Sequence, residues 1–170
     1  TDISFEQLLL SYQMDMAFRR DPAENPALQS ECLYSEPYAL VVPQNHRLTE
    51  QNFTGMHDLE NDKFILSNLA QTTYYTAGLR QIFEHHRFTP DVRIETDFGG
   101  MILGLVSKGL GVTILPYSYS FSALPNVRFI ALPYRTNLYV TWRKNDNSPV
   151  LKNILKLVSE TASKYALDSN

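Results

Sequence analysis

The chain has 170 residues, enough for one domain or for two small lobes that share a core. Lys and Arg number 15 and Asp and Glu number 18, so the formal net charge of −3 argues against a nucleic-acid-binding domain with a basic face. The composition is that of a globular protein, and no apolar run of about 18 residues predicts a membrane span. The first residues lack the basic start and apolar centre of a signal peptide, so we expect a cytoplasmic location. A single cysteine, Cys32, excludes a disulfide within the chain and a Cys-based zinc site, and we expect it to be a small buried apolar residue.

Apolar spacing in the first part of the chain predicts one helix and three strands. A helix is expected over 5–12, with Ser4 as its N-cap, because apolar residues recur there at helical spacing. A strand over 14–18 and a loop over 19–26 follow. Further strands are expected over 28–33 and 38–42, the second of which is continuously apolar and ends at Pro43.

The rest of the chain alternates between helices and strands. In chain order we expect a polar loop over 44–54, a strand over 63–66, a helix over 71–88, a strand over 91–96, a helix over 101–108, a strand over 112–115, strands over 127–132 and 138–142, and a helix over 150–165. Gly109 is expected to take a left-handed conformation that ends the helix before it. Residues 117–121 are expected to form a loop. This alternation predicts an α/β fold with parallel strands joined by helices.

Three stretches, in order, carry a family resemblance. Residues 14–18 read Met-Asp-Met-Ala-Phe, residues 40–48 read Leu-Val-Val-Pro-Gln-Asn-His-Arg-Leu, and residues 105–116 read Leu-Val-Ser-Lys-Gly-Leu-Gly-Val-Thr-Ile-Leu-Pro. Together they resemble the effector-binding domain of LysR-type transcriptional regulators, although Arg47 stands where the family usually has proline. Phe-Thr-Pro at 88–90 and Trp-Arg at 142–143 also fit the family pattern.

The resemblance implies two Rossmann-like lobes joined by two crossover strands, as in type 2 periplasmic binding proteins. Lobe I is expected at 1–40 and 138–170, and lobe II at 41–137. The family's first strand and helix have no counterpart here, so the chain is expected to enter the domain at its second helix. The resemblance also implies a homodimer or homotetramer, with the helix face at 76–86 as a candidate contact. It further implies that DNA is bound only through a helix-turn-helix module outside this sequence.

Strand ends supply the candidate ligand-binding residues, because ligands of open α/β sheets bind beyond the carboxyl ends of the strands. Arg20, next to Phe18, offers a planar fork suited to a carboxylate, phosphate or sulfate; its alternative is a surface ion pair with Asp21 or Glu24. After the strand at 63–66 the candidates are Ser67, Thr72, Thr73 and Tyr75. Their alternative is simple helix capping, with Tyr74 and Tyr75 packed in the core. After the strand at 91–96 the candidates are Phe98 and Gly99, and Asp97 is expected to face solvent or to pair with an arginine.

These features predict a domain that senses a small organic acid. A solute-binding protein of a transporter is the alternative with the same fold. An enzyme is not predicted, because the sequence has no nucleophile elbow, phosphate-binding loop or metal-ligand cluster. His85 and His86 are adjacent and so point to different helix faces, and Gly109-Leu110-Gly111 precedes a strand instead of a helix. No cofactor and no metal are expected.

Overall fold

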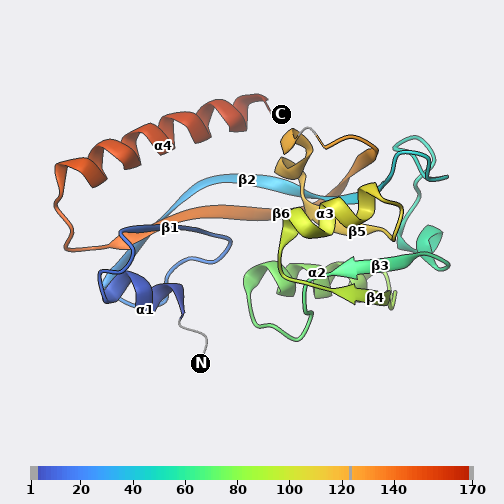
Figure 1. The fold of residues 1–170 in the computed structure, drawn as a ribbon, viewed down its shortest axis with the longest axis horizontal. Helices are drawn as coiled ribbons and strands as arrows, with labels where there is room; N and C mark the ends of the chain where they lie inside the picture. The colour runs from blue at the N-terminus through green and yellow to red at the C-terminus, as the bar shows by residue number, and fades with distance from the viewer. Residues whose placement is uncertain (1–3, 123, 169–170) are drawn as a thin grey trace. The chain divides into compact units, whose positions relative to one another are not determined.

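A computed structural model describes residues 4–122 and 124–168 (Figure 1). The chain divides into two compact units. Unit 1 is Thr1–Glu36 with Asn137–Asn170, and unit 2 is Pro37–Thr136. Two long strands, β2 (Leu28–Pro43) and β6 (Val127–Arg143), pass from one unit to the other.

Unit 1 places one helix on each side of its strands. Helix α1 (Phe5–Leu10) begins at Ser4, whose hydroxyl accepts the Gln7 N–H while the Gln7 side chain accepts the Ser4 N–H, so the predicted N-cap is confirmed. Strand β1 (Met16–Arg19) pairs antiparallel with β6. Helix α4 (Pro149–Asp168) packs on the face that carries Val140 and Trp142, whereas α1 covers the opposite face through Leu9 (Figure 1).

Unit 2 combines a parallel and an antiparallel pairing. Strands β3 (Lys63–Leu66) and β4 (Asp91–Glu95) are parallel, and β5 (Thr113–Pro116) pairs antiparallel with β2. A parallel bridge from Phe64 to Val112 connects β3 to the start of β5. The strand order is β1-β6-β2-β5 in the larger sheet and β3-β4 in the smaller one. The expected parallel arrangement is therefore confined to β3, β4 and this bridge.

Helices cover the unit 2 strands and give it two apolar cores. Helix α2 (Tyr74–His85) and the 3-10 helix η1 (Met56–Leu59) contribute to the larger core around Phe64, and helix α3 (Gly99–Ser107) to the smaller one around Ile65. A further 3-10 helix, η2 (Tyr117–Ser122), lies where the sequence predicted a loop. Gly109 has φ of 75°, so the predicted left-handed residue after α3 is confirmed.

Two predictions about the strands were wrong for the same reason. The strands expected at 28–33 and 38–42 form the single strand β2, and those at 127–132 and 138–142 form β6. The polar segments that suggested breaks, 34–37 and 133–137, continue the extended backbone from one unit to the next.

Helix α2 starts three residues later than expected because Thr73 caps it. Cys32 is exposed in β2, so the expected burial was also wrong.

Candidate functional site

Arg20 lies directly after the last residue of β1 and pairs with a buried carboxylate. Its Nη2 lies 2.8 Å from Oε1 of Glu36, a side chain that is 0% exposed, whereas the Arg20 side chain is 19% exposed. The ion pair of Arg20 therefore differs from the surface pair with Asp21 or Glu24 given as its alternative, and Asp21 lies 3.4 Å from Arg19. Arg20 Nη1 is buried and has no hydrogen-bond partner among the described residues. This nitrogen is therefore a donor that still lacks an acceptor.

Phe18 is half-exposed beside an apolar groove of unit 1. The groove has a volume of about 400 Å³. The residues that line it come from β1, β2, β6 and α4: Phe18, Leu33, Tyr34, Leu138, Leu157, Val158, Thr161 and Ala162. Phe18 thus offers apolar surface close in sequence to the charged Arg20.

In unit 2, β3 and β4 end at the same edge because they are parallel. Ser67 follows β3 and is buried, whereas Phe98 and Gly99 follow β4. Phe98 is 72% exposed. A Cβ on Gly99 would clash with the Tyr119 hydroxyl, so any other residue there would require the Tyr119 side chain to move. The structure therefore brings these strand-end residues of unit 2 to one edge.

The start of α2 uses two of the predicted residues for local structure. Thr73 is the N-cap: its hydroxyl accepts the Thr76 N–H at 3.2 Å. The Tyr75 hydroxyl donates to the Ile114 carbonyl at 2.9 Å, and the Tyr75 ring stacks on Tyr38 at 5.7 Å between centroids. Thr72 is exposed. Capping and packing therefore account for Thr73 and Tyr75, and a ligand contact by either residue stays a prediction.

Two charged side chains fix the loop between β3 and α2. Arg80 reaches back from α2 and donates to the carbonyl oxygens of Leu69 and Gln71. Asp97 accepts from the Asn68 N–H at 3.3 Å and from the Gln71 side-chain amide at 2.7 Å. Asp97 is exposed, as expected, but its hydrogen-bond donors are neutral groups and not an arginine. Sequence reasoning missed Arg80, whose helical position gave no signal of a loop contact.

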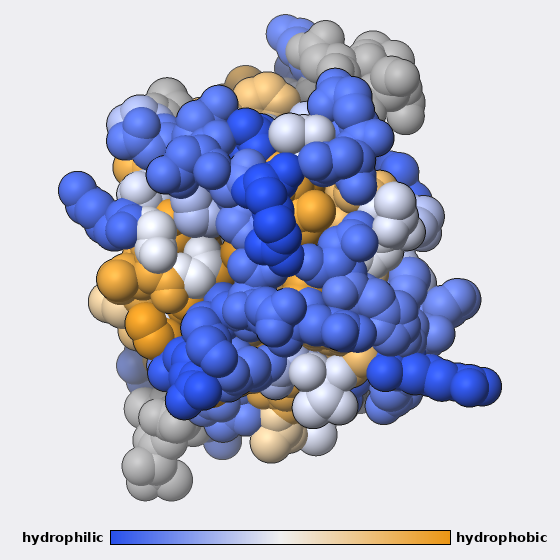
Figure 2. Space-filling view, turned by 90° about the vertical axis from the view of Figure 1, so that its right-hand side faces the viewer, coloured by the Kyte–Doolittle hydropathy of each residue, from blue (hydrophilic) through white to orange (hydrophobic). Residues whose placement is uncertain are grey.

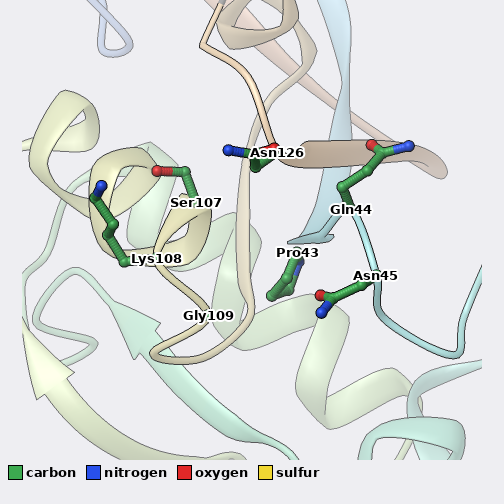
Figure 3. Close-up of a pocket in the computed structure, with 7 residues that line it drawn as sticks. All are labelled: Pro43, Gln44, Asn45, Ser107, Lys108, Gly109 and Asn126. Carbon is green, nitrogen blue, oxygen red and sulfur yellow. The ribbon is translucent and has the colours of Figure 1, made fainter.

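A depression in unit 2 contains none of the predicted ligand-binding residues (Figure 3). It lies at the turn that follows α3 and has a volume of about 420 Å³. The residues that line it are Pro43, Gln44, Asn45, Ser107, Lys108, Gly109 and Asn126. The face of the molecule shown in Figure 2 is largely hydrophilic, with smaller hydrophobic areas.

Metal ligands and membrane spans were searched for among residues 4–122 and 124–168. No group of three or more His, Cys, Asp or Glu side chains in this part of the chain is placed to hold a metal ion. In the same residues, no helix combines the length and the apolar character needed to cross a bilayer.

The sequence matches the LysR substrate-binding domain model over residues 2–163. The chain belongs to this family. The fold class and the family predicted from the sequence are therefore confirmed, and the family is one of regulatory domains rather than enzymes. The relatives named below are transcriptional regulators and regulator domains, so nothing in them favours a transporter's solute-binding protein.

Among the similar proteins is the transcriptional regulator CatR of Pseudomonas putida. It is 26% identical over 165 residues, which are 95% of this chain and 57% of CatR. The chain thus spans little more than half the length of that regulator. The transcriptional regulator AlsR of Bacillus subtilis is 26% identical over 156 residues, 89% of this chain and 51% of AlsR.

The same fold is present in solved effector-binding domains. The BenM domain with its effector benzoate matches with a TM-score of 0.73 and 20% identity, covering 94% of this chain and 74% of that one. The QuiR domain in complex with shikimate matches with a TM-score of 0.72 and 21% identity, covering 92% and 76%.

Proposed function

We propose that this chain is the effector-sensing part of a LysR-type regulator and that it binds a small organic acid. Arg20 of unit 1 pairs with the acidic group, and Phe18 contacts the body of the acid. Strand-end residues of unit 2, namely Ser67, Thr72, Thr73, Tyr75, Phe98 and Gly99, are the further candidate contacts. The division into ligand-binding lobes at 1–40 with 138–170 and at 41–137 belongs to the same proposal.

The observation that carries the proposal is the unpaired Nη1 of Arg20. A guanidinium has five N–H donors in a fixed fork, and Glu36 engages only one side of it in the described contacts. A buried donor without an acceptor costs roughly 1–3 kcal/mol, so an acceptor supplied by a ligand would be favourable. Carboxylates match the guanidinium fork best, and the benzoate bound by BenM and the shikimate bound by QuiR are both carboxylates.

Calorimetric titration of the 170-residue chain with benzoate and with benzamide tests the acid preference. The two molecules have nearly the same shape, so binding of benzoate alone supports an anion site. Equal affinity for both contradicts it.

Two variants test the role of Arg20. Arg20→Met combined with Glu36→Gln removes the guanidinium without leaving a buried carboxylate behind, and we expect benzoate binding to be lost. Glu36→Gln alone frees the guanidinium from a competing carboxylate, and we expect tighter binding. Arg19→Met is the matched control, because Arg19 already pairs with Glu6 and Asp21. Unchanged affinity in both Arg20 and Glu36 variants would overturn the assignment of Arg20.

Assembly and DNA binding are proposed on the family alone. We infer a homodimer or homotetramer, with DNA contacted through a helix-turn-helix module outside this sequence. Light scattering coupled to gel filtration measures the assembly: a mass of two or four chains supports it, and a single chain at all concentrations contradicts it.

A further inference from the structure

We propose that Asp97 determines effector specificity in unit 2. Its carboxylate makes the carboxyl end of β3 and β4 anionic, so the part of the effector bound there is a neutral hydrogen-bond donor, such as a hydroxyl group, and not a second acid. The inference rests on the proposed function, and it uses contacts of unit 2 only.

The position of Asp97 places it at the candidate ligand edge. Strand β4 ends at Glu95, and the Thr96 N–H still donates to the Leu66 carbonyl at 3.1 Å. Asp97 therefore follows the last rung between the two parallel strands. Ser67 directly follows Leu66, the last residue of β3, which pairs with Glu95 of β4.

The contacts of Asp97 leave its charge without a counter-ion. Its two oxygens accept from the Asn68 N–H and from the Gln71 amide, which are both neutral donors. Within residues 4–122 and 124–168, no Lys, Arg or His nitrogen lies within 4.0 Å of either oxygen, in contrast to Asp62 and Asp91. Arg80, the cation that contacts this loop, donates to carbonyl oxygens instead.

An exposed carboxylate with two neutral donors can still accept further hydrogen bonds. A carboxylate offers about four lone-pair sites, so a ligand hydroxyl can donate to the sites that remain. Such a bond is charge-assisted and is therefore about twice as strong as a bond between neutral groups. A ligand carboxylate at the same position would meet a like charge. The hydroxyl groups of Ser67 and Thr72 can donate or accept, so they do not discriminate in this way.

Three acids that differ at one ring position test the proposal. Benzoate, 3-hydroxybenzoate and isophthalate carry a hydrogen atom, a hydroxyl group and a second carboxylate at that position. We expect the 170-residue chain to bind 3-hydroxybenzoate most tightly and isophthalate most weakly in calorimetric titrations.

The variant Asp97→Asn removes the negative charge while keeping the hydrogen bonds that position the loop, so it tests the effect of the charge alone. The amide keeps an acceptor oxygen for Asn68, and the Gln71 side chain can rotate to accept from the new NH₂ group. We expect isophthalate to bind roughly three- to ten-fold more tightly than to the unmodified chain, because the like charge of the Asp97 carboxylate is removed. We expect 3-hydroxybenzoate to bind several-fold more weakly, because its hydroxyl group loses a charge-assisted hydrogen bond. The affinity for benzoate should change by less than about two-fold, because benzoate has no such hydroxyl group.

Glu50→Gln is the matched control, since it removes the same charge from an exposed position of unit 2. It should leave all three affinities unchanged. If Asp97→Asn weakens all three acids equally, Asp97 only positions the loop and the proposal is wrong. If the chain binds all three acids and Asp97→Asn changes none of them, the role of Asp97 alone is contradicted. A chain that binds no acid contradicts the proposed function as well.

Discussion

The guanidinium of Arg20 lies 2.8 Å from the carboxylate of Glu36, a side chain with no exposed surface. This pair links the end of β1 to the part of β2 that belongs to unit 1. A buried carboxylate that loses its cation is still desolvated, but the attraction of the ion pair no longer offsets this desolvation.

Arg20→Met should therefore lower the free energy of unfolding by about 3 kcal/mol, as measured by urea denaturation. Adding Glu36→Gln to that variant should recover most of the loss, because no buried charge then remains. A double variant that is less stable than Arg20→Met alone would show that Glu36 is stabilised by other groups.

Arg143 at the end of β6 holds the segment that follows α1. Its side chain is 4% exposed, and it donates to the carbonyls of Leu9 and Met14 and to the carboxylates of Asp15 and Asp146. Burial acts to lower the pKa of Arg143, but the hydrogen bonds that it donates to both carboxylates outweigh this effect, so the pKa is raised.

Arg143→Met removes one hydrogen-bond donor from each of two carbonyl oxygens and two carboxylates. We expect a loss of about 3 kcal/mol in urea denaturation. Arg143→Lys should recover part of that loss, because an ammonium group keeps the charge but has fewer donors in a less suitable geometry. Equal stability of the Met variant and the unmodified chain would mean that water replaces all four contacts.

The sequence predicted local features well where one residue type determines them. Ser4 and Gly109 are examples, because a side-chain cap and a left-handed residue depend on chemistry within three or four positions. The family resemblance supplied the fold class, because its motifs extend over most of the chain.

Contacts between distant segments could not be predicted from local pattern. Glu36 looks like a surface residue in a polar segment, yet it is buried and pairs with Arg20, which lies 16 positions away in the sequence. The strands expected at 28–33 and 38–42 are separated by this segment, but β2 continues through it. The sequence indicates that Asp97 follows a strand, but its hydrogen bonds with Asn68 and Gln71 depend on the parallel pairing of β3 with β4.

Asp62 connects the stability of unit 2 to pH. Its carboxylate binds Arg47 at 2.8 Å and His46 at 2.9 Å. Burial acts to raise the pKa of Asp62, but the hydrogen bonds from Arg47 and His46 are together stronger, so the pKa lies below its ordinary value. The folded state therefore holds this proton less tightly than the unfolded state does. The resulting stability is present above the ordinary pKa of about 3.9 and is lost as the pH falls through the lower folded-state pKa.

Asp62→Asn should lower the free energy of unfolding by about 1–2 kcal/mol at neutral pH. The difference from the unmodified chain should shrink as the pH falls below about 4, where Asp62 of the unfolded state becomes protonated, and should be lost as the pH passes through the lower folded-state pKa. Urea denaturation across this pH range measures both effects. Glu50→Gln is the control, because Glu50 is exposed in the loop after Leu48. A difference that does not depend on pH would show that the charge of Asp62 is not what stabilises the loop.

Two fully buried threonines should respond in opposite ways to the same substitution. Thr113 in β5 has a hydroxyl oxygen with no hydrogen-bond partner among the described residues, whereas the Thr141 hydroxyl in β6 lies 2.8 Å from that of Ser30. Valine has the same shape as threonine but no hydroxyl group. Thr113→Val removes a buried hydroxyl group that makes no hydrogen bond with the described residues, so it should raise the free energy of unfolding by about 1 kcal/mol. Thr141→Val leaves Ser30 without one partner and should lower it by about 1–2 kcal/mol. Urea denaturation of the two variants under the same conditions checks the opposite signs, and destabilisation by both would mean that the Thr113 hydroxyl has an acceptor, such as a buried water.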